Sequence, residues 1–309
     1  MVGGSPFQIP EQFAARMRGV FGAEPATAWL ASLPDIIEQL ADEWRLDVQP
    51  PIANLSYTWV APATREDGTR AMLKVGFPDP ELQVSIDMLR LCDGRGMVRL
   101  LESKREQVAT LLELIEPGAT LRTVEDDDEA MAIAADVMRQ IWRPVPASHT
   151  YPHVADWAGG LARLRERFDG GTGPLPKTLV EQAETYFAEL LPSMAEPVVL
   201  HADLHHENIL SATRAPWLAI DPHGAIGEPA YETGALLRNP IPEIASEPNL
   251  ARLLSRRVDV LSERLGFDRQ RVRAWAIAQA VLSAWWDVEG ETGEDFPAIA
   301  CAEALAAGT

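Results

Sequence analysis

The chain has 309 residues, 47% of them hydrophobic, and a formal net charge of −19. So negative a chain would repel nucleic acid and anionic membranes, and it suits a cationic partner. No apolar run reaches membrane length, the first residues lack a secretory-signal pattern, and the two cysteines form neither a disulfide framework nor a metal motif. We therefore expect a cytoplasmic globular protein, long enough for two domains or for one domain of two lobes.

The first third of the chain has the pattern of helices followed by a small sheet. Apolar residues at three- and four-residue spacing between 21 and 44 predict two helices on the outside of the sheet, interrupted near Pro34. A hairpin is expected at 65–69, because Asp67-Gly68 suits positive backbone dihedrals. Strands are expected at 44–48, 57–61, 70–75, 96–101 and 109–114, and a helix at 81–91.

The remainder of the chain is mainly helical. Five consecutive acids at 125–129 precede an apolar repeat of helical period. Acids favour the first turn of a helix, so we interpret this run as a helix start rather than as a metal site. Further helices are expected at 157–168, 178–191, 250–265 and 271–288, and the segment 227–232 is expected to run into a helix through Leu237.

One polar segment between two short apolar runs carries candidate chemistry. It has the sequence HADLHHENIL at 201–210, and the next apolar run ends at Asp221. Asp203 can accept a proton from a hydroxyl group, while Asn208 and Asp221 offer oxygen ligands to magnesium. Three nearby histidines also suggest zinc, but the order and spacing of these three residues favour the kinase pattern H-R-D-x-x-x-x-N followed by a metal-binding Asp.

The same part of the chain carries a specific family resemblance. HADLHHENIL at 201–210, AIDPHG at 219–224 and GEPAYETGALLRNP at 227–240 resemble the streptomycin 6-phosphotransferase (aminoglycoside/hydroxyurea resistance kinase) family of the aminoglycoside phosphotransferase superfamily. Ala202 stands where protein kinases have Arg, and Pro222-His223 replaces their Phe. These departures indicate a small-molecule kinase of related fold.

The resemblance covers nearly the whole chain and implies a two-lobed, protein-kinase-like α+β fold. Residues 1–115 would form a nucleotide-binding lobe with an antiparallel sheet and helices. Residues 116–309 would form a mainly helical lobe for catalysis and substrate binding.

The resemblance also implies roles for the polar segment. Asp203 would orient and deprotonate the acceptor hydroxyl, and Asn208 and Asp221 would hold Mg²⁺. His201 would support the loop. Glu232 would bond the backbone of the loop and hold it rigid, without transferring a proton.

An ATP site is implied in the N-terminal lobe. The loop around Ser56 and Tyr57 would fold over the phosphates, although it lacks the glycine triplet of a phosphate loop. Lys74 would bind the phosphate oxygens. Glu113 and Ile115 would hydrogen-bond adenine through backbone groups, so these positions need no particular side chain.

The carboxylate that should hold Lys74 departs from the family pattern. Ser85 stands where a Glu is expected on the helix at 81–91. Glu81 lies one turn earlier and Asp87 two residues later, and either could substitute. Because two residues along a helix point in different directions, Glu81 is the better candidate.

The end of the last long helix combines indoles with carboxylates. Trp286, Asp287 and Glu289 lie close together in sequence, and carboxylates beside aromatic faces suit a guanidinium or ammonium group. We take them as candidates for binding a cationic acceptor. The alternative is a core tryptophan at a helix end, followed by a solvated acidic loop.

We therefore expect an enzyme that transfers the γ-phosphoryl group of ATP to a hydroxyl of an aminoglycoside, with streptomycin or a near relative as acceptor. A host metabolite or hydroxyurea is an alternative acceptor. A nucleotide-binding protein with little turnover is a further alternative, motivated by Ser85, although the intact Asp203, Asn208 and Asp221 argue against it. No nucleic-acid or membrane partner is expected.

Overall fold

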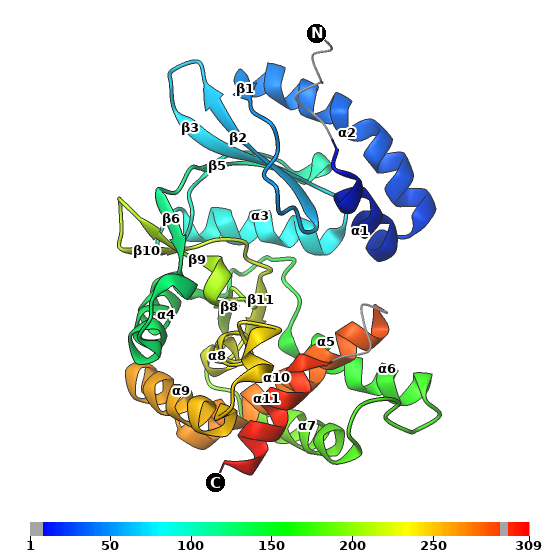
Figure 1. Ribbon diagram of the computed structural model, residues 1–309, viewed down its shortest axis with the longest axis vertical. Helices are drawn as coiled ribbons and strands as arrows, with labels where there is room; N and C mark the ends of the chain where they lie inside the picture. Colours follow the sequence, from blue (N-terminus) through cyan, green and yellow to red (C-terminus); the bar gives the residue numbers. More distant parts are fainter. Residues whose placement is uncertain (1–8, 291–295, 309) are drawn as a thin grey trace. The chain divides into compact units, whose positions relative to one another are not determined.

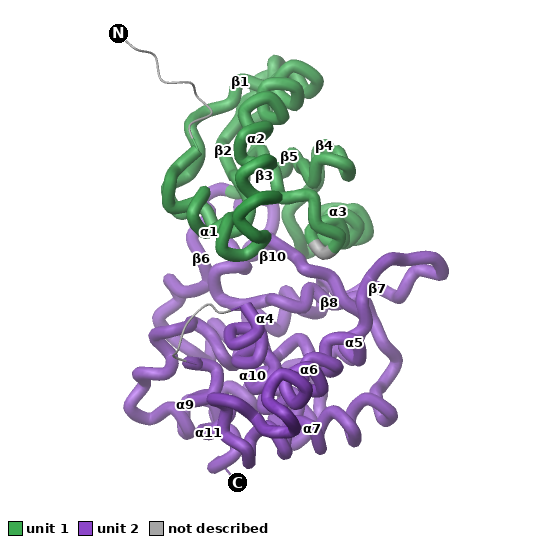
Figure 2. The backbone as a smooth tube through the Cα atoms, turned by 90° about the vertical axis from the view of Figure 1, so that its right-hand side faces the viewer, with its two compact units in different colours: residues 1–115 green, residues 116–309 purple. Residues whose placement is uncertain are grey.

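The computed structural model describes residues 9–290 and 296–308. The chain divides into two compact units, Met1–Ile115 (unit 1) and Glu116–Thr309 (unit 2), which have different colours in Figure 2. Unit 1 has a five-stranded sheet, whereas unit 2 is mainly helical and has two small sheets. None of the described helices is both long and apolar enough to cross a membrane.

The sheet of unit 1 is antiparallel, with the strand order β1-β2-β3-β5-β4 (Figure 1). The expected hairpin joins β2 to β3, where Gly68 has a φ of 83° and Arg65 N donates to Thr69 O at 2.9 Å. The strands are β1 (Leu46–Val48), β2 (Thr58–Arg65), β3 (Arg70–Gly76), β4 (Leu100–Lys104) and β5 (Ala109–Glu113).

Two N-terminal helices, α1 (Glu11–Phe21) and α2 (Ala23–Trp44), share a hydrophobic core with this sheet. Leu73 and Val75 of β3 are fully buried in that core. Since successive strand residues point to opposite faces, Lys74 between them faces away from α1 and α2. A third helix, α3 (Pro80–Cys92), follows β3.

Two expectations for unit 1 are wrong. Helix α2 runs unbroken through Pro34, because buried Leu33 and Ile37 keep the same face packed on both sides of the proline. This packing compensates for the one backbone hydrogen bond that proline cannot make. Strand β4 starts at Leu100 rather than at 96, since Gly96 turns the chain with a left-handed φ of 69°.

Unit 2 contains two small sheets in addition to its helices. One sheet has the order β10-β9-β6 and the other β11-β8-β7. The strands are β6 (Pro117–Thr120), β7 (Arg143–Pro144), β8 (Val198–Leu200), β9 (Ile209–Ala212), β10 (Trp217–Ala219) and β11 (Ala225–Gly227). The helices are α4 (Asp127–Ile141), α5 (Val154–Ala158), α6 (Gly160–Arg167), α7 (Lys177–Leu190), α8 (Thr233–Leu237), α9 (Leu250–Leu265), α10 (Arg269–Glu289) and α11 (Pro297–Ala307).

The acidic run at 125–129 begins α4, as predicted. Asp126 caps the helix by accepting a hydrogen bond from Glu129 N at 3.0 Å. Asp127 pairs with Arg257 of α9 at 2.7 Å. The run therefore starts one helix and attaches it to another.

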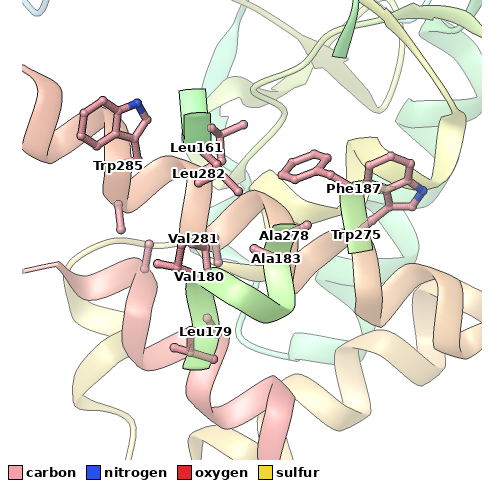
Figure 3. Packing of buried hydrophobic residues seen from close by; sticks show 14 of the residues in the cluster. Leu161, Leu179, Val180, Ala183, Phe187, Trp275, Ala278, Val281, Leu282 and Trp285 are labelled. Atoms are coloured by element: carbon pink, nitrogen blue, oxygen red, sulfur yellow. The ribbon is translucent and has the colours of Figure 1, made fainter. Parts of the chain in front are cut away.

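Helix α10 forms the centre of the core of unit 2 (Figure 3). Its Trp275, Leu282 and Trp285 are buried, and α7 and α11 pack against it. The expected single helix at 157–168 is wrong, because α5 ends and α6 begins at Gly159-Gly160. A Cβ at Gly160 would lie 3.0 Å from Leu282 and from Trp285, so glycine permits the close approach of α6 to α10.

Candidate active site

Two antiparallel strand pairs in unit 2 position the candidate catalytic residues. β8 pairs with β11, and β9 pairs with β10. The loop that contains Asp203 joins β8 to β9, and Asp221 follows β10. Ile220 N donates to Asn208 O at 2.9 Å, so Asn208 and Asp221 lie at neighbouring ends of paired strands.

His201 connects the two loops. Its Nε2 lies 2.7 Å from Ile220 O, and since a carbonyl only accepts, Nε2 carries the proton. Nδ1 then accepts from Asp203 N at 3.3 Å. The carbonyl of His201 accepts from His223 N at 3.0 Å and Gly224 N at 3.1 Å. Burial lowers the pKa of His201 to about 4, so the ring is neutral at neutral pH.

Glu232 fixes the start of the same loop. Its carboxylate accepts from His201 N at 2.7 Å and from Ala202 N at 2.8 Å, and the side chain is fully buried. Burial raises the pKa of Glu232 to about 7. Ala202 has a left-handed φ of 73°, a strain of about 1–3 kcal/mol for a non-glycine residue. The two hydrogen bonds to Glu232 stabilise this conformation.

Asp203 lies among basic side chains and keeps 27% of its own side chain exposed. Oδ2 lies 3.5 Å from His205 Nε2 and 3.9 Å from His223 Nε2, while Oδ1 lies 3.4 Å from Arg238 Nη2. Burial alone would raise the pKa of Asp203, but the hydrogen bond to His205 and the charges of all three neighbours lower it well below its usual range. The carboxylate is therefore ionised and can accept a proton.

His205 lies between two carboxylates. Besides Asp203, its Nδ1 meets Glu207 Oε2 at 2.9 Å, and Glu207 Oε1 meets Arg122 at 2.7 Å. Burial would lower the pKa of His205, yet hydrogen bonds to Asp203 and Glu207 raise it to about 9. His205 therefore remains positively charged at neutral pH.

Asn208 and Asp221 provide two oxygen ligands. Such a pair suits a magnesium site better than a metal site in which the protein supplies every ligand. Asn208 Nδ2 donates to Asp203 O at 2.9 Å, so Oδ1 is the side-chain atom that would bind a metal ion. Asp221 has a left-handed φ of 56°, a conformation that is uncommon for non-glycine residues but that aspartate tolerates better than most. Within residues 9–290 and 296–308, no cluster of three or more His, Cys, Asp or Glu is arranged to hold a metal ion. Magnesium typically takes one or two protein oxygens and completes its shell with phosphates and water.

The phosphate-binding candidates of unit 1 lie on two neighbouring strands or next to them. Ser56 and Tyr57 are exposed on the loop that leads into β2, and Tyr57 as a whole residue is 46% exposed. Lys74 lies on β3 opposite Val60 of β2. The hairpin therefore pairs β3, which carries Lys74, with β2, the strand that follows the loop of Ser56 and Tyr57.

Glu113 and Ile115 end unit 1. Glu113 N donates to Arg99 O at 3.0 Å, and Glu113 Oε1 accepts from Arg99 N at 2.8 Å. The backbone N–H of Glu113 is thus used inside unit 1. An adenine contact at Glu113 would fall to its carbonyl.

The candidate partners of Lys74 on α3 differ in what they contact. Ser85 Oγ donates to Leu82 O at 2.7 Å, as a serine within a helix commonly does. Asp87 pairs with Arg105 at 2.6 Å. The side chain of Glu81 lies outside the part of the chain that the structure describes.

The aromatic and acidic end of α10 packs against α5 and α6. Glu289 accepts two hydrogen bonds from Arg163, at 2.6 and 2.9 Å. Trp286 meets Trp157 edge to face, with ring centroids 5.9 Å apart. Asp287 lies between them in sequence and is half-buried. Glu289 therefore already has a guanidinium partner within the chain.

Sequence reasoning missed two buried residues, Arg238 beside Asp203 and Gln279 beside Arg238. Arg238, 7% exposed, follows α8, and its Nη1 donates to Gln279 Oε1 of α10 at 2.7 Å. Gln279 is 1% exposed. The available signal was a lone Arg at the end of the apolar stretch 233–237, because a buried guanidinium needs partners.

Comparison with known proteins gives the family. A model of the aminoglycoside/hydroxyurea antibiotic resistance kinase family matches residues 43–290. The chain belongs to this family. It is 36% identical over 300 residues to a streptomycin 6-kinase of Streptomyces glaucescens, covering 96% of this chain and 97% of that protein. It is also 31% identical over 309 residues to a hydroxyurea phosphotransferase of Kitasatospora aureofaciens, covering 98% and 87%.

Solved structures agree on the fold of this family member. A choline kinase of Streptococcus pneumoniae has a TM-score of 0.61 at 15% identity, covering 89% of this chain and 97% of that one. The aminoglycoside phosphotransferase APH(4)-Ia has a TM-score of 0.60 at 16% identity, covering 88% and 99%. The expected α+β, protein-kinase-like fold is confirmed, and the family makes this chain a phosphotransferase that acts on a hydroxyl group.

Proposed function

We propose that the protein transfers the γ-phosphoryl group of ATP to a hydroxyl of an aminoglycoside, with streptomycin as the acceptor. The observation that carries the proposal is the ionised, partly exposed Asp203, on a loop whose backbone is fixed by Glu232 and His201. Asn208 and Asp221 lie at neighbouring strand ends in the same unit. The streptomycin 6-kinase relatives support the acceptor.

In this proposal Asp203 orients the acceptor hydroxyl and takes its proton. The hydroxyl oxygen forms a bond to the γ-phosphorus as the bond to the bridging oxygen breaks, and ADP leaves with that electron pair. Asn208 and Asp221 hold Mg²⁺, which when bound neutralises the charge on the phosphates. Arg238 and His205 keep Asp203 ionised and oriented until the proton arrives.

Unit 1 supplies the nucleotide contacts. Lys74 binds phosphate oxygens, and the loop at Ser56 and Tyr57 covers them. Glu113 and Ile115 meet adenine through their backbones. The known structures of the same fold include one with ADP and hygromycin B bound, which supports a nucleotide cofactor here.

A hydroxyurea phosphotransferase among the relatives gives a second candidate acceptor. Hydroxyurea is small and uncharged, whereas streptomycin carries guanidinium groups. The net charge of −19 favours the cationic acceptor, because an acidic protein concentrates cations near its surface.

Product analysis tests the proposal. The protein is incubated with ATP, Mg²⁺ and either streptomycin, hygromycin B, hydroxyurea or choline, and the products are followed by ³¹P NMR and mass spectrometry. We expect a phosphomonoester of streptomycin and one ADP for each product molecule. Phosphorylation of hydroxyurea or choline alone would overturn the acceptor, and ATP binding with no product from any acceptor would overturn the kinase.

A further inference from the structure

Arg238 lies between Asp203 and Gln279, which come from different parts of unit 2. Nη1 donates to Gln279 Oε1 at 2.7 Å, and Nη2 lies 3.4 Å from Asp203 Oδ1. The side chain of Arg238 is 9% exposed, so water screens its charge poorly. One end of the guanidinium thus meets a neutral amide and the other meets the candidate catalytic carboxylate.

The structure leaves room for Gln279 at a neighbouring helix. A Cβ on Gly234 of α8 would lie 2.1 Å from Gln279 Oε1, closer than any two such atoms can approach. Only glycine at position 234 therefore permits the amide to reach Arg238. The hydrogen bond between Gln279 and Arg238 therefore depends on Gly234 of α8 as well as on Gln279 of α10.

The backbone around Arg238 is also fixed. Arg238 N donates to Gly234 O at 3.2 Å, and Asn239 Nδ2 donates to Ala235 O at 2.8 Å. Arg257 Nη1 donates to Asn239 O at 2.7 Å. The remaining conformational freedom of Arg238 is that of its side chain, and the hydrogen bond to Gln279 restricts it.

We propose that Gln279 is a positioning residue, whose neutral oxygen holds the Arg238 guanidinium towards Asp203 without cancelling its charge. This proposal rests on the proposed function, in which Asp203 receives the proton. A glutamate at this position would have nearly the same shape but would compete with Asp203 for the guanidinium. An apolar residue would leave Nη1 without its acceptor, at the cost of an unpaired buried donor.

The two carboxylate oxygens of Asp203 also have different neighbours. Arg238 lies at Oδ1, and Oδ2 faces His205 and His223. With Oδ1 held by Arg238, the carboxylate has less freedom to rotate, and its second oxygen is the one that meets the acceptor. Gln279 then affects turnover through orientation, and nucleotide binding depends on other residues.

Two substitutions of Gln279 and a control separate charge from packing. Gln279→Glu keeps shape and an acceptor oxygen but adds a charge, whereas Gln279→Leu keeps only the volume. Gln182→Glu on α7, whose amide meets Tyr186, is the matched control. Circular dichroism and thermal melting confirm folding, and kcat and KM are measured for ATP and for streptomycin.

We expect Gln279→Glu and Gln279→Leu each to lower kcat by about tenfold or more, with KM for ATP changed less than about twofold. Gln182→Glu should leave both constants unchanged. Normal kcat in Gln279→Glu with loss only in Gln279→Leu would reduce Gln279 to a structural acceptor. Normal kcat in both would reduce it to packing, and either result overturns the proposal.

A crystal structure of the Gln279→Glu variant provides an outcome that does not depend on the acceptor. If the parent protein phosphorylates no aminoglycoside, the proposed function fails and this structure decides the inference alone. We expect the guanidinium of Arg238 to turn away from Asp203 towards the new carboxylate. An unchanged separation of 3.4 Å between Arg238 and Asp203 would overturn the proposal.

Discussion

The loop at 201–208 and the end of α10 at 286–289 both combine carboxylates with ring side chains, but their partners differ. Glu232 accepts two backbone N–H groups of the loop, and Asp203 has the cations Arg238 and His205 at 3.4 and 3.5 Å while 27% of its side chain stays exposed. At the end of α10, Glu289 makes two short hydrogen bonds to Arg163. A carboxylate whose cationic neighbours are not in close hydrogen-bond contact can still bind a substrate group. A carboxylate with a bidentate guanidinium partner is largely occupied by that partner.

Replacing the carboxylate of Asp203 should have the largest effect. Asp203→Asn removes the proton acceptor, and we expect kcat to fall by about three orders of magnitude with KM for ATP little changed. Steady-state kinetics with streptomycin measures this. Asp136→Asn, on an exposed face of α4, is the matched control and should be silent. A loss below about tenfold in Asp203→Asn would assign the proton to another group.

The buried Glu232 should make stability depend on pH. Its pKa is raised by burial to about 7, from an ordinary value of 4.5. Between these values the folded protein binds the proton more tightly than the unfolded chain does, so stability is highest below pH 4.5 and falls as pH rises through 7. The loss is about 3 kcal/mol, at about 1.4 kcal/mol for each pKa unit.

Urea denaturation at several pH values measures this effect. Glu232→Gln lacks the titration but shares all other titrating groups, so the difference between the two stability curves isolates Glu232. The variant loses one acceptor for a backbone N–H and should be the less stable protein at low pH. Parallel curves from pH 4.5 to 8 would show that Glu232 has an ordinary pKa in the folded protein.

The contrast between the loop at 201–208 and the end of α10 also explains what the sequence could predict. Part of the loop is held by residues close in sequence, because Asn208 Nδ2 donates to the carbonyl oxygen of Asp203 five positions earlier. The partner of Glu289 lies 126 positions away on α6, and Gln279 lies 41 positions from Arg238. Such pairs depend on how helices pack, which no local pattern specifies.

The wrong predictions for the helices at Pro34 and at 157–168 have a similar cause. Pro34 favours a break locally, yet packing of α2 on the sheet maintains the helix. The apolar period at 157–168 fits one helix, but the approach of α6 to Leu282 and Trp285 requires Gly160, and the chain bends there. In both places tertiary packing outweighs the local preference.

Asp221→Asn tests the metal assignment. The substitution keeps the side chain's size and removes a charge, and we expect kcat to fall by about two orders of magnitude. Rising Mg²⁺ concentration should recover part of the loss, because a weakened site fills at higher metal. Turnover measured against Mg²⁺ concentration gives both numbers. Normal turnover at saturating Mg²⁺ would remove Asp221 from the metal site.

The smallest expected effect concerns the end of α10 and the charge of the acceptor. If Asp287 and Glu289 meet the cationic acceptor, neutralising them should raise KM for streptomycin and flatten its dependence on salt, since salt screens charge attraction. Neutralising Asp287 and Glu289 together should raise KM by about threefold at low salt. Arg163 already offsets part of the charge of Glu289, so Glu289→Gln alone should change KM less than the pair does, and it should cost stability by less than about 1 kcal/mol, as for an exposed ion pair.

Arg163→Gln supplies the matched control for this pair. Removing the guanidinium leaves the carboxylate of Glu289 to attract the acceptor, so KM for streptomycin should fall if this carboxylate lies within reach of it. KM for ATP should stay constant in all three variants. If KM for streptomycin is the same in the parent protein, the doubly neutralised variant and Arg163→Gln at low salt, the acids at the end of α10 only hold α6 and solvate the helix end. The acceptor would then be bound by other groups of unit 2, and the assignment of Asp203 would be unaffected.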